Sequence, residues 1–215
     1  MPQARVLRGE RRDFRGGFTA LKIKMHLLSD VIFGNGVSVP GGEDISVLRD
    51  GNGVPYYKGG TFKGIFREEL ERYLRWTMTG EAAIHARLED LLGSSGNDRE
   101  AEDKLVFSDF TLSEYVKEKV LAELGDDREA VLDAFTNLRT FTSIDGDGIV
   151  SEGSLRSARC VNQGLYFYSE ISCRREDEPL VKEVISLVKW LGSMRNRGFG
   201  KVKIEPADAG LEQGE

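Results

Sequence analysis

The chain has few of the residues that build disulfide frameworks and metal clusters. Its 215 residues include two cysteines, Cys160 and Cys173, and two histidines, His26 and His85. The cysteines lie thirteen positions apart in a segment whose hydrophobic pattern predicts an extended chain, which separates them too far for a disulfide bond. Neither a disulfide nor a cysteine-based metal site is therefore expected, and both thiols are predicted to be ordinary core or surface groups.

A membrane-spanning or secretory segment is also missing. The sequence has no run of about 18 apolar residues that would cross a bilayer. With 40% hydrophobic residues over 215 positions, it predicts one compact domain. We expect a soluble, cytoplasmic protein with no membrane partner. The arginine-rich start lacks the apolar stretch of a signal peptide, and its arginines are Arg5, Arg8, Arg11, Arg12 and Arg15.

An excess of positive charge is lacking as well. The formal net charge is −6, from 30 Lys and Arg against 36 Asp and Glu, which alone argues against nucleic-acid binding. Acidic residues concentrate in 97–103, in 126–129 and after Pro206, whereas basic residues lie near glycines and on predicted strand faces. This distribution fits an assembly role in which basic residues line one channel and acidic residues meet neighbouring subunits.

Hydrophobic periodicity predicts the order of a six-element core. Thr61 is expected to cap the first core helix, and Pro179 to lie in the first turn of the second. The order strand, helix, strand, strand, helix, strand predicts an α+β fold with a ferredoxin-like (RRM-like) βαββαβ core. Strand patterns occur at 18–28, 104–112, 160–173 and 201–204, and helical stripes at 61–74 and 179–191.

The other segments are predicted to be additions to a single domain, residues 1–215, whose core covers about 16–205. An insertion at about 79–103 is helical to about Gly96, and a second at about 113–158 combines helical residues 114–135 with a protruding, thumb-like β-hairpin over 138–156. The tail, 206–215, is expected to be flexible and acidic. The connection 34–60 is unusually long for a compact domain, which indicates a functional loop.

Two helices on one face of the sheet would leave the other face open. Basic side chains and aromatic rings alternate onto this open face, as in sheets that bind RNA through phosphate contacts and base stacking. A plain solvated face is the alternative for any one of these residues. The set comprises Lys22, Lys24, His26, Tyr166, Tyr168, Lys201 and Lys203.

Two glycine-containing motifs carry a family resemblance. Residues 56–67, YYKGGTFKGIFR, resemble the P-G-S-S-L-K-G-x-x-R signature that opens the first helix in the RAMP superfamily. Residues 192–200, GSMRNRGFG, are similar to its C-terminal G-G-x-R-S-R-G-x-G-K element. Glycines let the backbone approach a phosphate, and a helix N-terminus offers free N–H groups.

Three further segments are similar to the repeated, target-RNA-cleaving backbone subunit of type III CRISPR (Csm-like) complexes. They are 42–50 (GEDISVLRD), 105–110 (LVFSDF) and 142–155, which resembles the family's thumb region. The resemblance implies an RNA-binding subunit that coats the guide RNA. It also implies target RNA, copies of itself or related backbone subunits in a filament, and other type III effector subunits as partners.

The resemblance places the family's catalytic aspartate at Asp44, with Mg²⁺ or another divalent metal as cofactor, and implies cuts in the target RNA at regular intervals. A ribose 2′-hydroxyl would attack the adjacent phosphate while Asp44 orients a metal or accepts a proton. One carboxylate cannot complete a Mg²⁺ shell, so RNA, water or a neighbouring subunit must supply the rest. The expected RNA-binding residues are Lys22, Lys24, Lys58, Lys63, Arg67, Arg139, Tyr166, Arg195, Arg197 and Lys201.

Several alternatives remain open. The alternative for Asp44 is a solvent-facing turn residue in a glycine-rich loop, in which case the chain would be a noncatalytic subunit of the same filament. A guide-processing endoribonuclease would need a catalytic histidine, but neither histidine lies in the loop after the first strand. A third hypothesis is a single-strand RNA-binding domain unrelated to CRISPR. Asp109 is expected to cap or pair locally, and Asp145 and Asp147 form an EF-hand-like fragment without the remaining ligands.

Overall fold

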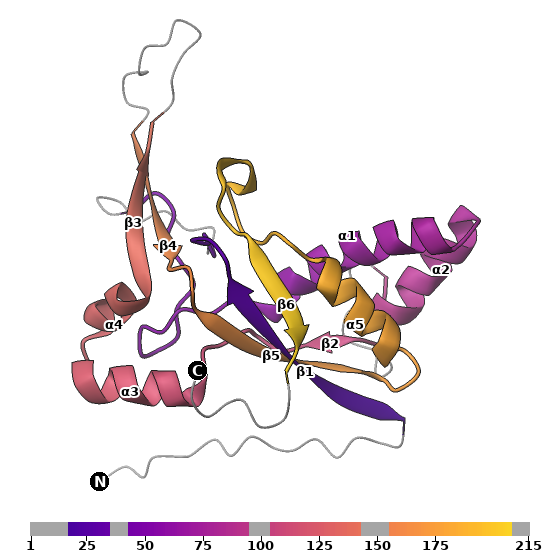
Figure 1. Cartoon of the computed structure of the whole chain (residues 1–215), viewed down its shortest axis with the longest axis horizontal. Helices are drawn as coiled ribbons and strands as arrows, with labels where there is room; N and C mark the ends of the chain where they lie inside the picture. Colours follow the sequence, from indigo (N-terminus) through magenta and orange to yellow (C-terminus); the bar gives the residue numbers. More distant parts are fainter. Residues whose placement is uncertain (1–16, 35–42, 95–103, 143–154, 208–215) are drawn as a thin grey trace, which may run out of the picture.

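The computed structural model describes residues 17–34, 43–94, 104–142 and 155–207. Its main sheet has four strands, β1 (Phe18–Leu27), β2 (Val106–Phe107), β5 (Tyr166–Arg174) and β6 (Val202–Pro206), in the order β2-β5-β1-β6. All neighbours are antiparallel. Numbered within the core, this order is 2-3-1-4, so the structure confirms the ferredoxin-like arrangement (Figure 1).

The period-two pattern explains why the central strands form. In β1, Leu21, Ile23, Met25 and Leu27 are buried while the intervening side chains face outward. The neighbouring β5 buries Phe167 and Ile171 on the same side, and Met25 stands opposite Phe167. One sheet face therefore forms the core and the other remains open.

The helices α1 (Gly59–Thr77) and α5 (Glu178–Leu187) cover the apolar face. They bury stripes that include Phe62, Phe66 and Leu70 in α1 and Val181 and Ile185 in α5, spaced three or four residues apart as one helix face requires. The predicted insertion contains α2 (Glu81–Leu92), which packs beside α1. Residues 95–103 of that insertion lie outside the described residues.

The second insertion forms a separate wing. It contains α3 (Glu114–Leu124) and α4 (Arg128–Phe135), whose first turns are capped by the side chains of Ser113 and Asp127. Strands β3 (Thr136–Phe141) and β4 (Arg156–Val161) then pair with each other and project from the body, and we call this element the thumb hairpin (Figure 1). The predicted hairpin is confirmed, but its strands extend over 136–141 and 156–161, beyond the predicted range of 138–156. Residues 143–154, with Asp145 and Asp147, lie outside the described residues.

Two strand boundaries differ from those predicted. Residues 104–112 form only a two-residue strand, because three residues, 108–110, stand opposite two of β5, 169–170, before pairing resumes between Thr111 and Tyr168. Residues 160–173 are not one strand, because the chain turns between β4 and β5 at 162–165. Cys160 and Cys173 therefore lie in different sheets, and both are buried and free. Burial raises the pKa of the Cys160 thiol to about 12 and that of Cys173 to about 11, which keeps both protonated.

The helix limits and the tail also differ. The first helix begins at Gly59, two residues before the expected cap Thr61, and the last ends at Leu187 because residues 189–191 turn to pair with 200–202. Strand β6 extends to Pro206, and the N–H of Ala207 donates to the carbonyl of Lys22, so the tail begins later than predicted. Within the described ranges, no helix is long and apolar enough to cross a membrane.

Candidate nucleic-acid interface

Asp44 lies at the base of the thumb hairpin. Its exposed carboxylate accepts a hydrogen bond from the N–H of Ser157 in β4 (2.7 Å), and its own N–H donates to the carbonyl of Ser157 (3.0 Å). We call residues 43–48 the Asp44 loop. Ile45 forms a parallel bridge with Ala158, so the start of this loop runs beside β4, whereas Val47 pairs with Gly34. The sequence placed Asp44 in a loop, and the fold joins that loop to the thumb.

A buried arginine holds the residue before Asp44. Arg159 in β4 is 8% exposed and donates from Nε to the carboxylate of Glu43. Its Nη1 donates to Asp133 (2.5 Å) at the end of α4 and to the hydroxyl of Thr136 (3.0 Å) at the start of β3. The sequence did not indicate that Glu43 and Arg159 meet, because the two residues are 116 positions apart.

Residues 192–200, the glycine loop, form a closed turn beside the thumb. The N–H of Leu191 donates to the carbonyl of Gly200 (2.8 Å), and Gly200 has a positive φ of 83°. A Cβ at Gly200 would lie 1.9 Å from the carbonyl oxygen of Leu191, so only glycine closes this turn. Arg195 and Arg197 form a short 3₁₀ turn at its tip and are exposed.

An apolar contact attaches the glycine loop to the thumb. The rings of Phe199 and Phe141 meet edge to face with centroids 5.5 Å apart. Ile45 of the Asp44 loop and Met194 of the glycine loop pack against the same small cluster, whose buried members are Ile32, Ala158 and Cys160. The fold thus brings the Asp44 loop, the thumb base and the arginine-bearing loop together.

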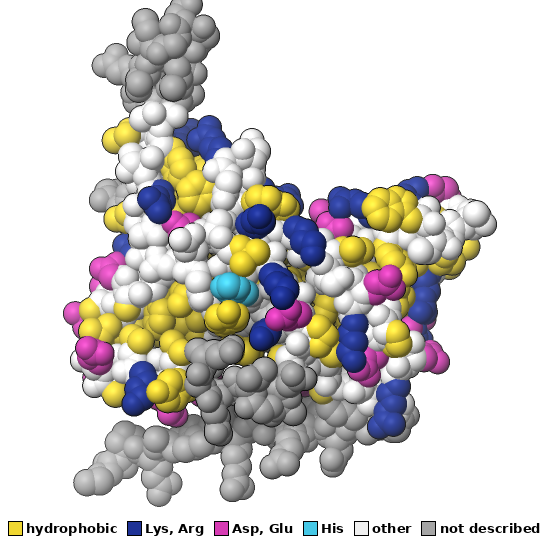
Figure 2. Space-filling model, in the orientation of Figure 1, with side chains coloured by type: hydrophobic (Ala, Val, Ile, Leu, Met, Phe, Trp, Pro, Cys, Tyr) yellow, Lys and Arg dark blue, Asp and Glu magenta, His cyan; other side chains and the backbone are white. Residues whose placement is uncertain are grey.

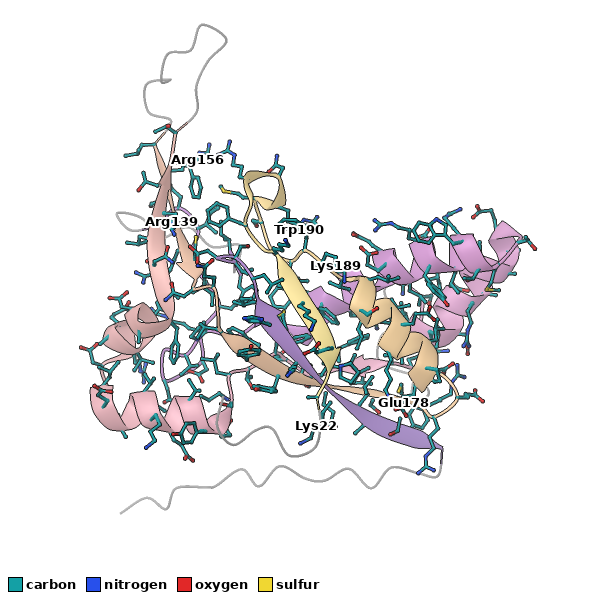
Figure 3. The ribbon with its side chains drawn as sticks, in the orientation of Figure 1. Lys22, Arg139, Arg156, Glu178, Lys189 and Trp190 are labelled. Carbon is teal, nitrogen blue, oxygen red and sulfur yellow. The ribbon has the colours of Figure 1, made fainter. Side chains whose placement is uncertain are left out.

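Asp30 joins the thumb to the sheet. Its Oδ2 accepts from Arg139 (Nη2, 2.8 Å) and Asn137 (Nδ2, 3.3 Å) in β3, and its Oδ1 accepts from the N–H of Gln163 (3.0 Å). Burial acts to raise the pKa of Asp30, but the hydrogen bonds from Arg139, Gln163 and Asn137 outweigh it and lower the pKa. Arg139, predicted to bind RNA, lies on the thumb (Figure 3). Its side chain is 55% exposed and is ion-paired to Asp30.

The open face carries the predicted basic side chains and aromatic rings, together with a carboxylate that the prediction missed. His26 stacks on Tyr166 with ring centroids 4.3 Å apart, and Lys24 lies 5.8 Å from the centre of the Tyr166 ring. Glu205 pairs with Lys24 (3.5 Å) and Lys203 (2.6 Å). Figure 2 shows a histidine (cyan) among Lys and Arg side chains (dark blue) and an acidic group (magenta) on this face. The same period-two rule that placed Lys203 outward also places Glu205 outward, so the sequence contained this signal.

A further basic group lies at the start of α1. Lys58 is exposed immediately before the helix, and Lys63 lines a cleft of about 210 Å³ with Gly59, Gly60 and Lys104. The N–H of Gly59 donates to Asp109 (2.8 Å), so the expected local role of Asp109 is confirmed. Arg67 instead donates to the carbonyl of Gly93 (2.6 Å), where it caps the C-terminus of α2.

The predicted residues therefore fall into three groups. Asp44, Arg139, Arg195 and Arg197 surround the thumb base, while Lys58, Lys63 and Arg67 lie at α1. The third group is on the sheet, with Lys22 exposed, Lys24 and Tyr166 half-buried, and Lys201 exposed next to β6. His26 lies on the open face and His85 on α2 beside Glu89, so the histidines do not form a common site.

A resident metal site does not form from the described residues alone. In the ranges that the structure covers, no group of three or more His, Cys, Asp and Glu side chains is arranged to hold a metal ion. Near Asp44, the carboxylate of Glu43 is already paired with Arg159. Mg²⁺ needs near-octahedral oxygen coordination, which one exposed carboxylate cannot supply.

Comparisons with known proteins identify the family. A model described as the RAMP superfamily matches residues 24–203, and a search of curated proteins gave no significant match. Among solved structures, the fold is similar to a chain of a type III-B Cmr-beta complex bound to cognate target RNA, with a TM-score of 0.62 and 15% identity, covering 87% of this chain and 97% of that one. It is also similar to a chain of the apo type III-B Cmr-beta complex, with a TM-score of 0.63 and 15% identity, covering 88% and 98%. At this identity the similarity is one of fold, and because the family model spans most of the sequence, this chain belongs to the RAMP superfamily.

Proposed function

We propose that this chain is a backbone subunit of a type III CRISPR ribonucleoprotein, which binds the guide RNA and cleaves complementary target RNA. Membership of the RAMP superfamily supports this role, as does the fold shared with chains of type III-B Cmr-beta complexes, one of them bound to cognate target RNA. In such an assembly the subunit would act in the cytoplasm, beside copies of itself or related subunits and other effector proteins.

RNA binding is assigned to the three basic groups. The exposed Arg195 and Arg197 of the glycine loop offer guanidinium groups suited to phosphates. Lys58 and Lys63 extend the basic surface at α1, and Lys22, Lys24, Tyr166 and Lys201 extend it on the sheet. Because these side chains are concentrated, they can bind RNA although the net charge of the chain is −6.

One observation carries the assignment of cleavage: the exposed carboxylate of Asp44 is fixed to the thumb base beside the arginine-bearing loop. In the proposed reaction, a ribose 2′-oxygen attacks the adjacent phosphorus in line and loses its proton to Asp44. The bond from phosphorus to the 5′-oxygen breaks, and that oxygen takes a proton from water. The products are a 2′,3′-cyclic phosphate and a 5′-hydroxyl, while Arg195 or Arg197 would offset the charge on the phosphate.

A divalent cation would bind together with the target RNA and not to the subunit alone. Asp44 would supply one ligand, and phosphate oxygens and water would supply the rest. Dependence of cleavage on Mg²⁺ is therefore expected only in the complete complex with RNA.

The test compares complexes reconstituted with wild type, Asp44→Asn or Asp44→Ala on a labelled complementary RNA, with Mg²⁺ or EDTA. Asp44→Asn retains an oxygen that can accept from the N–H of Ser157 but removes the charge, so it separates chemistry from loop structure. Asp50→Asn is the matched control, because Asp50 also accepts loop N–H groups, those of Asn52 and Val54. Regularly spaced, metal-dependent cuts that both Asp44 variants lose and Asp50→Asn retains would support the proposal.

A noncatalytic backbone subunit is the second candidate. The observation in its favour is that the Asp44 carboxylate already has a structural partner in Ser157. This candidate predicts tight target binding without cuts in wild type, and a loss of thumb order in Asp44→Ala but not in Asp44→Asn. Guide processing is less well supported, since His26 is stacked on the sheet and His85 lies on α2.

A further inference from the structure

Arg159 is a buried cation shared between three elements. Its side chain extends from β4 and reaches Glu43 in the Asp44 loop, Asp133 at the end of α4, and Thr136 at the start of β3. The hydroxyl of Thr136 in turn donates to the carbonyl of Leu132 (2.7 Å). A guanidinium that is 8% exposed requires such partners, because an unpaired charge in this position would be strongly destabilising.

The ion pair with Glu43 acts on the backbone of Asp44. Glu43 is the residue directly before Asp44, and its side chain is only 19% exposed. On the other side of Asp44, the carbonyl of Ile45 accepts from the N–H of Arg159 (3.0 Å). Arg159 therefore holds the chain on both sides of Asp44, by its side chain before it and by its main chain after it.

This arrangement adds to the contacts that hold Asp44. Asp44 is exposed, and its own side chain makes one hydrogen bond to the thumb among the contacts of the described residues. The main chain is held here as well, because the N–H groups of Asp44 and Ile45 both donate to the carbonyl of Ser157 (3.0 and 3.2 Å). In-line attack requires near-contact geometry, and the Glu43 ion pair adds a side-chain constraint on this segment without taking part in the chemistry.

We propose that Arg159, acting through Glu43, is the positioning residue for Asp44 in target cleavage. The proposal rests on the proposed function, since it assigns how the cleaving carboxylate is oriented. It assigns Arg159 no contact with RNA, because its guanidinium is buried and turned toward Glu43, Asp133 and Thr136. Loss of the ion pair should therefore lower the rate of the chemical step and leave target binding unchanged.

The experiment uses reconstituted complexes that contain Glu43→Gln, Arg159→Lys or Arg159→Met. Single-turnover cleavage at saturating target, target affinity, and hydrogen exchange of a peptide covering residues 43–48 are measured for each. Glu129→Gln is the matched control, because Glu129 forms a comparable ion pair with Arg49 on the exposed surface (2.6 Å). Glu43→Gln avoids the risk that truncating a buried arginine prevents folding.

We expect Glu43→Gln to slow cleavage by about 10- to 100-fold, the range that a displacement on the order of 1 Å produces. Affinity for target should change by less than about twofold, since no phosphate contact is lost. Exchange of the 43–48 peptide should become faster, and Arg159→Lys should lie between wild type and Arg159→Met. Glu129→Gln should match wild type in all three measurements.

Two other outcomes would contradict different parts of the argument, the positioning role alone or the proposed function as well. If wild type cleaves and Glu43→Gln cleaves at the same rate, or if rate and affinity fall together, the positioning role is wrong while the proposed function stands. If wild type binds target and does not cleave, the proposed function itself fails, and the role of Arg159 in cleavage fails with it.

Discussion

Replacing Asp30 by alanine tests whether the joint between thumb and sheet stabilises the fold. The carboxylate is 12% exposed and accepts from Arg139, Asn137 and the N–H of Gln163. The hydrogen bonds from Asn137 and Gln163 contribute a net of about 0.5–1.5 kcal/mol each, whereas the contribution of the exposed Arg139 is reduced by solvent screening. We therefore expect Asp30→Ala to lower the free energy of unfolding by about 2 kcal/mol at pH 7.

The same residue predicts a pH dependence. Its hydrogen bonds lower the pKa of Asp30 in the folded state below the ordinary value of an aspartate. The stabilisation is therefore present above the unfolded-state pKa of about 3.9, and it is lost as the pH falls through the folded-state pKa. The stability difference between wild type and Asp30→Ala should consequently shrink between about pH 5 and pH 3.

The assay is urea denaturation followed by circular dichroism at a series of pH values. Asp126→Ala, in the exposed turn between α3 and α4, is the control and should resemble wild type throughout. A difference for Asp30→Ala below about 0.5 kcal/mol at pH 7, the usual scatter of surface substitutions, would refute the reasoning. A difference that stays constant from pH 7 to pH 3 would also refute it, because it would owe nothing to the charge of Asp30.

Two further predictions concern the glycine loop and the open face. Gly200→Ala should destabilise by about 3 kcal/mol in urea denaturation, since its Cβ would overlap the carbonyl of Leu191, whereas Gly198→Ala, with a positive φ but open space, should cost about 1 kcal/mol. Equal losses of stability in Gly200→Ala and Gly198→Ala would contradict this prediction, because they would show that the structure relieves the overlap at position 200. Glu205→Gln should raise RNA affinity, because it releases Lys24 and Lys203 from their ion pairs. The slope of the logarithm of the binding constant against the logarithm of salt concentration should steepen by about 0.7 for each added phosphate contact. The measurement is filter binding, with Glu123→Gln on α3 as the control. An equal change of RNA affinity in the two variants would contradict the prediction.

Part of the fold follows from local patterns in the sequence. The alternation in β1 and β5 places Ile23, Met25 and Phe167 on one face, because successive side chains of a strand point to opposite sides. The stripes of α1 and α5 follow in the same way from helical spacing. These periodicities, with the order of the elements, are enough to predict the ferredoxin-like core and the open face.

The ends of α5 and β2 depend on contacts between segments, which local sequence patterns do not contain. The apolar residues Val188 and Leu191 continue the helical stripe of α5, yet the helix ends at Leu187 because the chain beyond it pairs with residues 200–202. Likewise, the extra residue opposite β5 shortens β2, although the composition of 104–112 favours a longer strand. In the first case backbone pairing with another segment outweighed local propensity, and in the second a bulge interrupted the pairing that the composition favours.

The sequence by itself determined the order of the core elements and the glycine motifs, because each depends on residues that are close together in the chain, and the resemblance of residues 42–50 to a family segment supplied the candidate Asp44. Only the tertiary structure decided which residues surround Asp44, since Glu43 and Arg159 are 116 positions apart and meet because the Asp44 loop runs beside β4. It also decided that Arg139 pairs with Asp30 and that Arg67 caps α2. The physical reason is that periodicity indicates which face of an element is buried, whereas ion pairs between elements depend on the path of the connecting loops and the register of the strands.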